Sequence, residues 1–157
     1  MRNLILKHPI IVAAAGVIVV ALLGGSMTDT GPWYQALNKP SWQPPGWLFA
    51  PAWTLIFAFV ALGATAAWRD VPSEGKRQGL ILLLCVNALL NVAWSFLFFQ
   101  MQRPDWALIE VAVFWASILA LIIYTLPYSL KAALYFAPYL AWVSIAAVLN
   151  WAVVSLN

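Results

Sequence analysis

Charged side chains are scarce in this sequence: they make up 8% of its 157 residues, whereas 64% of the residues are hydrophobic. A water-soluble domain carries about a quarter charged residues and about half apolar ones. The few basic residues are scattered along the chain, which excludes the dense basic surface of a nucleic-acid-binding protein. A chain of this composition must meet lipid over most of its surface, so we expect an integral protein of a lipid bilayer.

Residues of conventional catalytic and metal sites are also few. The one cysteine, Cys85, lies in an apolar run, and a single thiol excludes an internal disulfide framework. With one histidine, His8, the sequence shows no cluster of His, Cys, Asp and Glu at metal-ligand spacing. A glycine-rich phosphate loop and a nucleophile–base pair are also missing. We therefore expect no metal, no intrinsic cofactor and no acid–base catalytic site.

Long hydrophobic runs are what the sequence has in quantity. Five segments reach the roughly 20 apolar residues that a helix needs to cross a membrane. They cover residues 4–27, 47–68, 79–100, 106–126 and 132–156. Three of the four intervening breaks are short, so successive helices must be antiparallel neighbours. The sequence predicts a single all-α domain over residues 1–157, a bundle of five transmembrane helices with a long first loop.

The placement of lysine and arginine predicts the orientation of this bundle. Six of these cations lie on the N-terminal side of the spans, and two, Lys39 and Arg103, lie on the other side. By the positive-inside rule the N-terminus faces the cytoplasm, in what we expect to be a bacterial inner membrane. A signal peptide is an alternative for the N-terminal segment, although its apolar part is long for one.

Two of the expected helices carry polar side chains along one face. A carboxamide that faced lipid would leave its donors and acceptors unpaired at a high cost, so these faces should point into the bundle. Two interpretations stay open: hydrogen bonds that join helices, or the wall of a ligand cavity. The face of the third helix holds Asn87, Asn91, Trp94, Ser95 and Phe98, and that of the fifth holds Tyr139, Trp142, Ala146 and Asn150.

Charged residues avoid the helix centres. Glu110 lies about one turn into the fourth helix, where we expect it to reach the membrane interface or to pair with Arg103. A proton-coupled carrier usually needs an ionisable relay at mid-membrane, and none is visible in the sequence. This pattern argues against active transport.

Small residues four positions apart occur in two helices. Ala21 with Gly25, and Gly63 with Ala67, form such pairs. Small residues at this spacing let helix backbones approach closely, either within the bundle or across a dimer.

The first loop concentrates prolines and tryptophans. Residues 38–53 alone contain four prolines and three tryptophans. Prolines fix backbone dihedrals and lower the entropy lost when the loop becomes ordered, while the indole rings offer stacking surface. The segment therefore predicts a stiff aromatic cover suited to a flat apolar ligand, with Lys39 placed to meet a ligand carboxylate.

Motifs in three parts of the chain carry a family resemblance. The first loop reads Trp33-Tyr34-x-x-Leu37-x-Lys39-Pro40-x-Trp42-x-Pro44-Pro45, followed by Pro51-Ala52-Trp53-Thr54. The third helix reads Asn91-x-x-Trp94-Ser95-x-x-Phe98-Phe99, and the fifth reads Pro138-Tyr139-x-x-Trp142 and then Leu149-Asn150. Over essentially its whole length the chain resembles the TspO/MBR family, the bacterial tryptophan-rich sensory proteins and the mitochondrial translocator protein, or peripheral-type benzodiazepine receptor.

The resemblance implies a five-helix bundle, often a homodimer, with a ligand cavity beneath the first loop. Ligands of the family are porphyrins such as protoporphyrin IX and heme, and isoquinoline or benzodiazepine-type drugs. In some bacterial members the tryptophans that match Trp53 and Trp142 are linked to light-dependent porphyrin breakdown. Together with the two polar faces, the expected ligand-binding set is Trp42, Pro44, Pro45, Trp53, Asn87, Asn91, Trp94, Tyr139, Trp142, Ala146 and Asn150.

One family feature is missing. Animal members carry a cholesterol motif near the end of the fifth helix, with a tyrosine followed by a basic residue. Here Trp151 stands near the tyrosine position, and no lysine or arginine follows it. The resemblance therefore does not extend to cholesterol binding at that place.

Four functions follow from this pattern, and the sequence favours the first. It is a membrane receptor for tetrapyrroles with a sensory or regulatory role. The second is an enzyme that degrades porphyrin with light and oxygen, with Trp53 and Trp142 as redox partners instead of acid–base groups. The third is a translocator of porphyrins or sterols, and the fourth is a structural bundle whose cavity is incidental.

Overall fold

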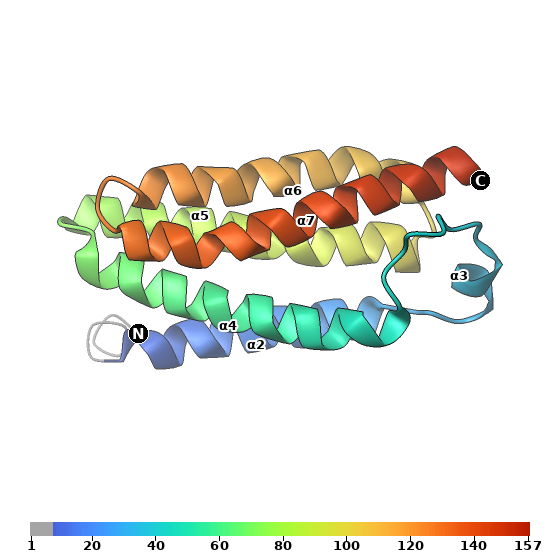
Figure 1. The fold of residues 1–157 in the computed structure, drawn as a ribbon. Coiled ribbons are helices and arrows are strands. Elements are labelled where there is room, and N and C mark those ends of the chain that lie inside the picture. Colours follow the sequence, from blue (N-terminus) through green and yellow to red (C-terminus); the bar gives the residue numbers. More distant parts are fainter. Residues whose placement is uncertain (1–7) are drawn as a thin grey trace.

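The structure, a computed structural model, describes residues 8–157 and consists of helices joined by loops (Figure 1). The helices long and apolar enough to cross a membrane number five in the described part. They are α2 (Pro9–Met27), α4 (Gly46–Asp70), α5 (Glu74–Ser95) with its π-helical extension η1 (Phe96–Gln100), α6 (Pro104–Thr125) and α7 (Leu130–Leu156), and a short helix, α3 (Pro32–Ala36), lies in the first loop. The expected all-α membrane bundle is confirmed.

Local sequence explains where these helices begin. Proline occupies the first turn of α2, α3 and α6, where its missing N–H costs nothing. The side chains of Ser73 and Ser129 accept hydrogen bonds from Lys76 N and Ala132 N, and so cap α5 and α7. Because Ser73 caps it, α5 begins before the apolar run that predicted a start at residue 79. The expected residues 4–7 of the first helix lie outside the described part of the chain.

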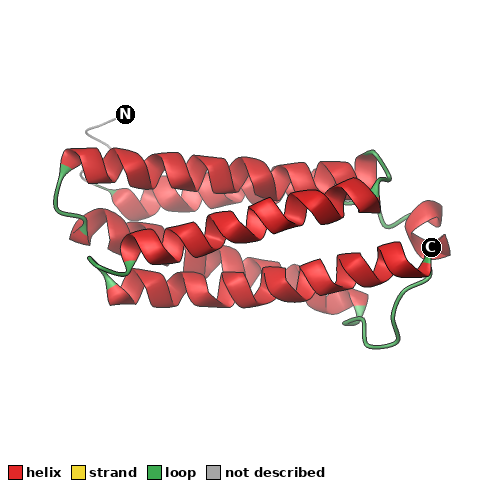
Figure 2. Ribbon diagram, turned by 90° about the horizontal axis from the view of Figure 1, so that it is seen from above, coloured by secondary structure: helices red, strands yellow, loops and turns green. Residues whose placement is uncertain are grey.

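The five long helices form a closed ring. Going around it, the order is α2, α4, α7, α6 and α5, and α5 packs against α2 again. One end of the bundle carries the start of α2 and the α4–α5 and α6–α7 connections (Figures 1 and 2). The other end carries the first loop, the α5–α6 connection and the C-terminus (Figure 1). The first loop therefore covers one mouth of the ring.

Close packing between α4 and α7 depends on a glycine. A Cβ atom added to Gly63 would lie 3.1 Å from the ring of Phe136, and Ala67, one turn further on, is fully buried. This small-residue pair therefore serves contact within the bundle. In α2, by contrast, a Cβ added to Gly25 would meet nothing within 4 Å, so the second pair is not used in the same way.

The end of α5 departs from α-helical geometry. At η1 the chain winds into one π-helical turn, closed by the Met101 N–H donating to the Phe96 carbonyl at 2.9 Å. Gln102 then takes up a left-handed conformation with φ of 53°, which reverses the chain toward α6. The wider turn buries both Phe98 and Phe99, although they are adjacent in sequence.

Candidate functional site

The two asparagines of α5 point into the bundle and form a hydrogen-bonded network, the inner network. Asn91 Nδ2 donates to the Tyr139 hydroxyl at 3.0 Å, and that hydroxyl donates to Asn87 Oδ1 at 3.1 Å. Asn87 Nδ2 donates to Ser117 Oγ at 2.8 Å, and Ser117 donates onward to the Phe114 carbonyl. This chain of bonds joins α5, α6 and α7, so at these positions the amides do connect helices.

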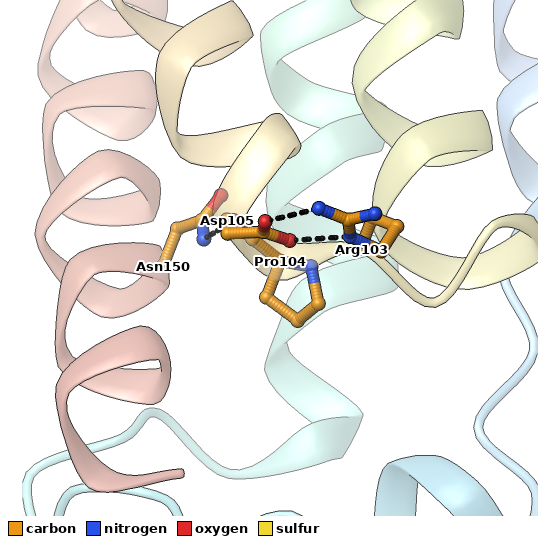
Figure 3. Close-up of polar contacts among 4 residues, drawn as sticks. All are labelled: Arg103, Pro104, Asp105 and Asn150. Carbon is orange, nitrogen blue, oxygen red and sulfur yellow. Dashed lines mark hydrogen bonds and ion pairs between the residues drawn. The ribbon is translucent and has the colours of Figure 1, made fainter.

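A second network, the outer network, lies nearer the first loop. Trp94 Nε1 donates to Asn150 Oδ1 at 3.0 Å, and Asn150 Nδ2 donates to the Pro104 carbonyl at 2.8 Å. Figure 3 shows Asn150 of α7 facing the first residues of α6, with the Arg103–Asp105 pair beside it. Asn150 is 1% exposed, so both ends of its amide are used in the interior.

Between the two networks lies a cluster of aromatic rings, the tryptophan cluster. Trp53 of α4 and Trp142 of α7 meet edge to face, with ring centroids 6.4 Å apart. Trp53 also stacks on Phe57 and meets Tyr139 edge to face, and Phe49 meets Trp142. The structure thus brings Trp53 of α4 into contact with Tyr139 and Trp142, which both lie on α7.

One indole in this cluster has an unused donor. Trp142 Nε1 is buried and makes no hydrogen bond with the described residues. Ala146 follows one turn later on α7 and is half-buried, between Trp142 and Asn150. An unpaired donor beside a small side chain is what the wall of a binding site offers to a ligand acceptor.

The expectation for Glu110 was wrong. Arg103 pairs with Asp105, through contacts of 2.8 and 2.5 Å, and not with Glu110. Both carboxylate oxygens of Glu110 are instead buried without a hydrogen-bond partner among residues 8–157. The sequence contained a signal for this: Glu110 lies three residues after Ala107 and four before Phe114, both buried, and so shares the inner face of α6.

The first loop is packed onto the bundle through aromatic contacts. The rings of Trp33 and Phe98 lie 6.0 Å apart, and those of Tyr34 and Phe99 lie 5.7 Å apart. Burial raises the pKa of the Tyr34 hydroxyl, while the hydrogen bond with Gln43 opposes this rise. Because η1 buries both phenylalanines, it supplies the platform on which the loop rests.

The loop is also tied to the C-terminus by hydrogen bonds between amides. The Asn38 backbone N–H donates to Asn157 Oδ1, and Asn157 Nδ2 donates to the Asn38 carbonyl, both at 3.0 Å. At the start of the loop, Gln100 Nε2 donates to the Met27 carbonyl at 2.8 Å. The expected stiff cover is therefore held at both its beginning and its middle.

The loop residues of the expected ligand-binding set lie apart from the tryptophan cluster. Trp42 is 50% exposed and makes no aromatic pair within the described chain, Pro44 is half-buried and Pro45 is exposed at the start of α4. Lys39 is occupied as well, since its Nζ lies 4.4 Å from the centre of the Tyr34 ring and donates to the Leu37 carbonyl. A direct role of these side chains at the ligand requires the loop to move.

Two hollows in the surface lie away from these residues. One, of about 230 Å³, lies between α4 and α7 at the opposite end of the bundle and includes Arg69 and Lys131. The other, of about 370 Å³, lies along the α6–α7 seam beside Trp115 and Ser144. Neither is lined by the expected site residues, so the networks and the tryptophan cluster define the candidate site through their side-chain contacts.

Comparison with known proteins decides the family. Residues 11–156 match the model of the TspO/MBR family, which covers nearly all of the chain. This chain belongs to the TspO/MBR family. The resemblance of the loop and helix motifs is thereby confirmed, and the TspO/MBR protein is an integral membrane protein.

Relatives of this TspO/MBR protein come from several kinds of organism. It is 35% identical to the tryptophan-rich protein TspO of Chlorobaculum tepidum, with 80% of this chain and 79% of the relative covered. It is 31% identical to the TspO of Archaeoglobus fulgidus, covering 94% and 96%, and 33% identical to the translocator protein of Sus scrofa, covering 89% and 87%. These names support a sensory or translocator role in a membrane.

Proposed function

We propose that this TspO/MBR protein is a membrane receptor that binds a tetrapyrrole, protoporphyrin IX or heme, and reports its presence to the cell. Isoquinoline and benzodiazepine-type molecules would occupy the same site. The main observation in support of this proposal is the edge-to-face contact of Trp53 and Trp142 beneath a tethered aromatic loop. The ligand would lie between the inner and outer networks.

The chemistry of this region suits a flat macrocycle. Rings from α4 and α7 offer large stacking surfaces, and aromatic pairs contribute about 0.5–1.5 kcal/mol beyond the area that they bury. The hydrogen-bonded amides on either side hold the helices in place, so little ordering is needed when a ligand binds. Because Trp142 contacts both Trp53 and Phe49, ligand access requires these contacts to open.

The binding test uses the full chain in phosphatidylcholine nanodiscs titrated with protoporphyrin IX. We expect saturable quenching of tryptophan fluorescence, and a dissociation constant that rises several-fold in Trp142→Phe. Trp151→Phe is the matched control, because Trp151 lies on the same helix but is 60% exposed on its outer side. The absence of saturable quenching, or equal dissociation constants for the wild type and Trp142→Phe, would refute a receptor built on this site.

A photo-oxidative enzyme is the second candidate, and the contact between the two indoles favours it. An indole next to an excited porphyrin can donate one electron to it, and a second indole in contact can share the resulting radical cation. The reduced macrocycle would pass that electron to molecular oxygen and form superoxide. The indole radical cation would take an electron back from the porphyrin, and superoxide would add to the resulting porphyrin radical cation, so that both oxygen atoms enter the macrocycle and the indoles are restored. Illumination of the complex in air should bleach the porphyrin band faster in the wild type than in the Trp53→Phe/Trp142→Phe double variant; equal rates would exclude catalysis by the protein.

A translocator of porphyrins or sterols is the third candidate. The α6–α7 hollow and the ring-shaped bundle offer routes for an apolar molecule, and no energy source is implied by either. Liposomes with and without the protein, loaded with protoporphyrin IX, would show downhill flux if the protein carries it. Equal flux from both kinds of liposome would leave binding as the activity.

We also propose a homodimer in a bacterial inner membrane. The outer face of α2 supports association, because it exposes Ile11, Ile18 and Leu22 and carries no close partner at Gly25. Disulfide crosslinking of single cysteines along α2 tests the dimer: crosslinks at helical spacing are expected, and their absence along the whole helix argues against an α2 interface.

A further inference from the structure

Glu110 is an unusual residue in this bundle because its carboxylate is buried without a partner. Neither of its oxygens accepts a hydrogen bond from the part of the chain that the structure describes. Buried polar groups are nearly always paired, and an unpaired charge in a membrane interior is costly. A residue of this kind in a transmembrane helix is by default the mark of a functional site.

The position of Glu110 places it between the two networks. On α6 it lies six residues after Pro104, which belongs to the outer network, and seven before Ser117, which belongs to the inner one. On the antiparallel helix α7, the stretch between Asn150 and Tyr139 holds Trp142 and Ala146. Glu110 therefore lies at the same depth as the tryptophan cluster. On either side of it, the inner and outer networks have their hydrogen bonds satisfied.

The neighbouring donors are already engaged. The Tyr139 hydroxyl donates to Asn87 within the inner network. Trp94 and Asn150 donate to acceptors within the outer network. At the end of α6, Arg103 is paired with Asp105. The described side chains thus leave two oxygen acceptors on Glu110 and one indole donor on Trp142 without partners.

We propose that Glu110 accepts a hydrogen bond from a ring N–H of the ligand, and that the site thereby prefers flat aromatic molecules that carry such a donor, such as free-base protoporphyrin IX, over those that lack one, such as heme. This inference rests on the proposed receptor function and specifies the ligand chemistry of the same site. A ligand N–H would favour the ionised form of Glu110, which can only accept hydrogen bonds, and hydrogen bonds to a charged group are about twice as strong as neutral ones. The aromatic walls require the donor to belong to a flat ring system.

A metal ion is a weaker candidate for the partner of Glu110. A cation needs several ligands, and no group of three His, Cys, Asp or Glu side chains that could hold one occurs among the described residues. A free-base tetrapyrrole, by contrast, carries ring N–H groups, and Trp142 Nε1 remains to donate to an acceptor on the same ligand.

The test compares carbazole with fluorene. These tricyclic molecules have nearly the same shape, and both are uncharged, but carbazole has a ring N–H where fluorene has a CH₂ group. Dissociation constants are measured by equilibrium dialysis against the full chain in nanodiscs, with empty nanodiscs to subtract partition into lipid. We expect the wild type to bind carbazole about tenfold more tightly than fluorene, from the usual strength of a hydrogen bond to a charged group.

Three variants assign that preference to Glu110. We expect it to fall in Glu110→Gln, which keeps a neutral acceptor, and to vanish in Glu110→Leu, which has none. Asp105→Asn removes the same charge near the outer end of the same helix and should keep the full preference. Circular dichroism and thermal unfolding confirm that each variant is folded; Glu110→Leu should be at least as stable as the wild type, because it buries no unpaired carboxylate.

The outcomes separate this inference from the proposed function. A wild type without preference for carbazole, or a preference retained in Glu110→Leu, overturns the role of Glu110. If protoporphyrin IX still quenches saturably in the same preparations, the receptor function stands without it. If protoporphyrin IX and both tricyclic probes fail to bind, the site itself and the inference fall together.

Discussion

At the scale of single residues, one hydroxyl holds the centre of the bundle together. The Tyr139 hydroxyl accepts from Asn91 and donates to Asn87, and all three side chains are less than 10% exposed. Each of these bonds replaces what would otherwise be an unpaired group far from water. The network fixes the rotation of α5 relative to α7, and with it the direction in which the neighbouring aromatic rings point.

Removing that hydroxyl should therefore destabilise the protein. We expect Tyr139→Phe to lower the free energy of unfolding by about 1–2 kcal/mol, since two polar partners lose a bond inside a membrane bundle. The measurement is thermal unfolding in detergent followed by tryptophan fluorescence. Tyr135→Phe is the control on the same helix, because the Tyr135 hydroxyl makes no hydrogen bond to the described residues, and a melting temperature equally lowered in both variants would contradict the prediction.

At the scale of elements, the first loop is fixed to the helix bundle by specific contacts. Its aromatic residues rest on η1, and Asn38 is joined to Asn157 at the end of α7. The prolines lower the entropy cost of ordering the loop, but its position comes from these two contacts. The loop thus links the ends of α5 and α7, the two helices that supply most of the candidate site.

Breaking the contact between the loop and the C-terminus should free the loop while leaving the bundle intact. In Asn157→Ala we expect faster amide hydrogen exchange for residues 32–45 and little change in the melting temperature, because the contact is exposed and lies outside the core. Mass spectrometry of exchanged peptides measures this. Ser155→Ala removes only a bond within α7 and serves as the control. Unchanged exchange in Asn157→Ala would show that the Asn157 side chain does not hold the loop.

The packing of α4 on α7 depends on the absence of a side chain at one position. Gly63→Ala should lower the melting temperature, because the added methyl group would lie 3.1 Å from the Phe136 ring and from Tyr135 Cβ. We expect a loss of about 1–3 kcal/mol. Gly16→Ala is the matched control in α2: nothing lies within 4 Å of its added Cβ, and the higher helix propensity of alanine should keep or raise stability. An unchanged melting temperature in Gly63→Ala would mean that α4 and α7 can move apart at this position without loss of stability.

At the scale of the whole molecule, the closed ring of five helices creates two different ends. The end opposite the first loop holds the α4–α5 and α6–α7 connections (Figure 1). The cations at those helix ends are Arg69 in the last turn of α4, Lys76 and Arg77 at the start of α5, and Lys131 at the start of α7. The positive-inside rule predicts that this end faces the cytoplasm, and we propose that the covered mouth with the candidate site faces outward. A ligand would then approach the site from the outer side or from the bilayer.

Cysteine labelling tests this orientation. In a Cys85→Ala background, Ser41→Cys in the exposed part of the first loop should react with a membrane-impermeant maleimide on intact cells. Glu74→Cys, exposed at the other end, should react only after permeabilisation. The opposite labelling pattern would reverse the proposed orientation.

Predictions from the sequence were most accurate for features that depend on interactions within one segment of the chain. The number of spans followed from the length of apolar runs, and the inward direction of Asn87 and Asn91 followed from the cost of an amide in lipid. The family motifs identified Trp53 and Trp142, which the structure brings into contact. The inward direction of Glu110 could have been predicted from its spacing to Ala107 and Phe114. Its position near the end of the helix predicted an interfacial or Arg103-paired side chain instead.

By itself, the amino-acid sequence determined the membrane environment, the five helices and the faces that avoid lipid, because hydrophobicity and helical period act within each segment. Only the tertiary structure decided the ring order, the partner of each amide and the contact between Asn38 and Asn157. Those contacts join residues 30 to 119 positions apart and depend on how whole helices rotate against one another. The unpaired state of Glu110 belongs to this second group, since whether a buried carboxylate finds a partner is settled by every helix around it.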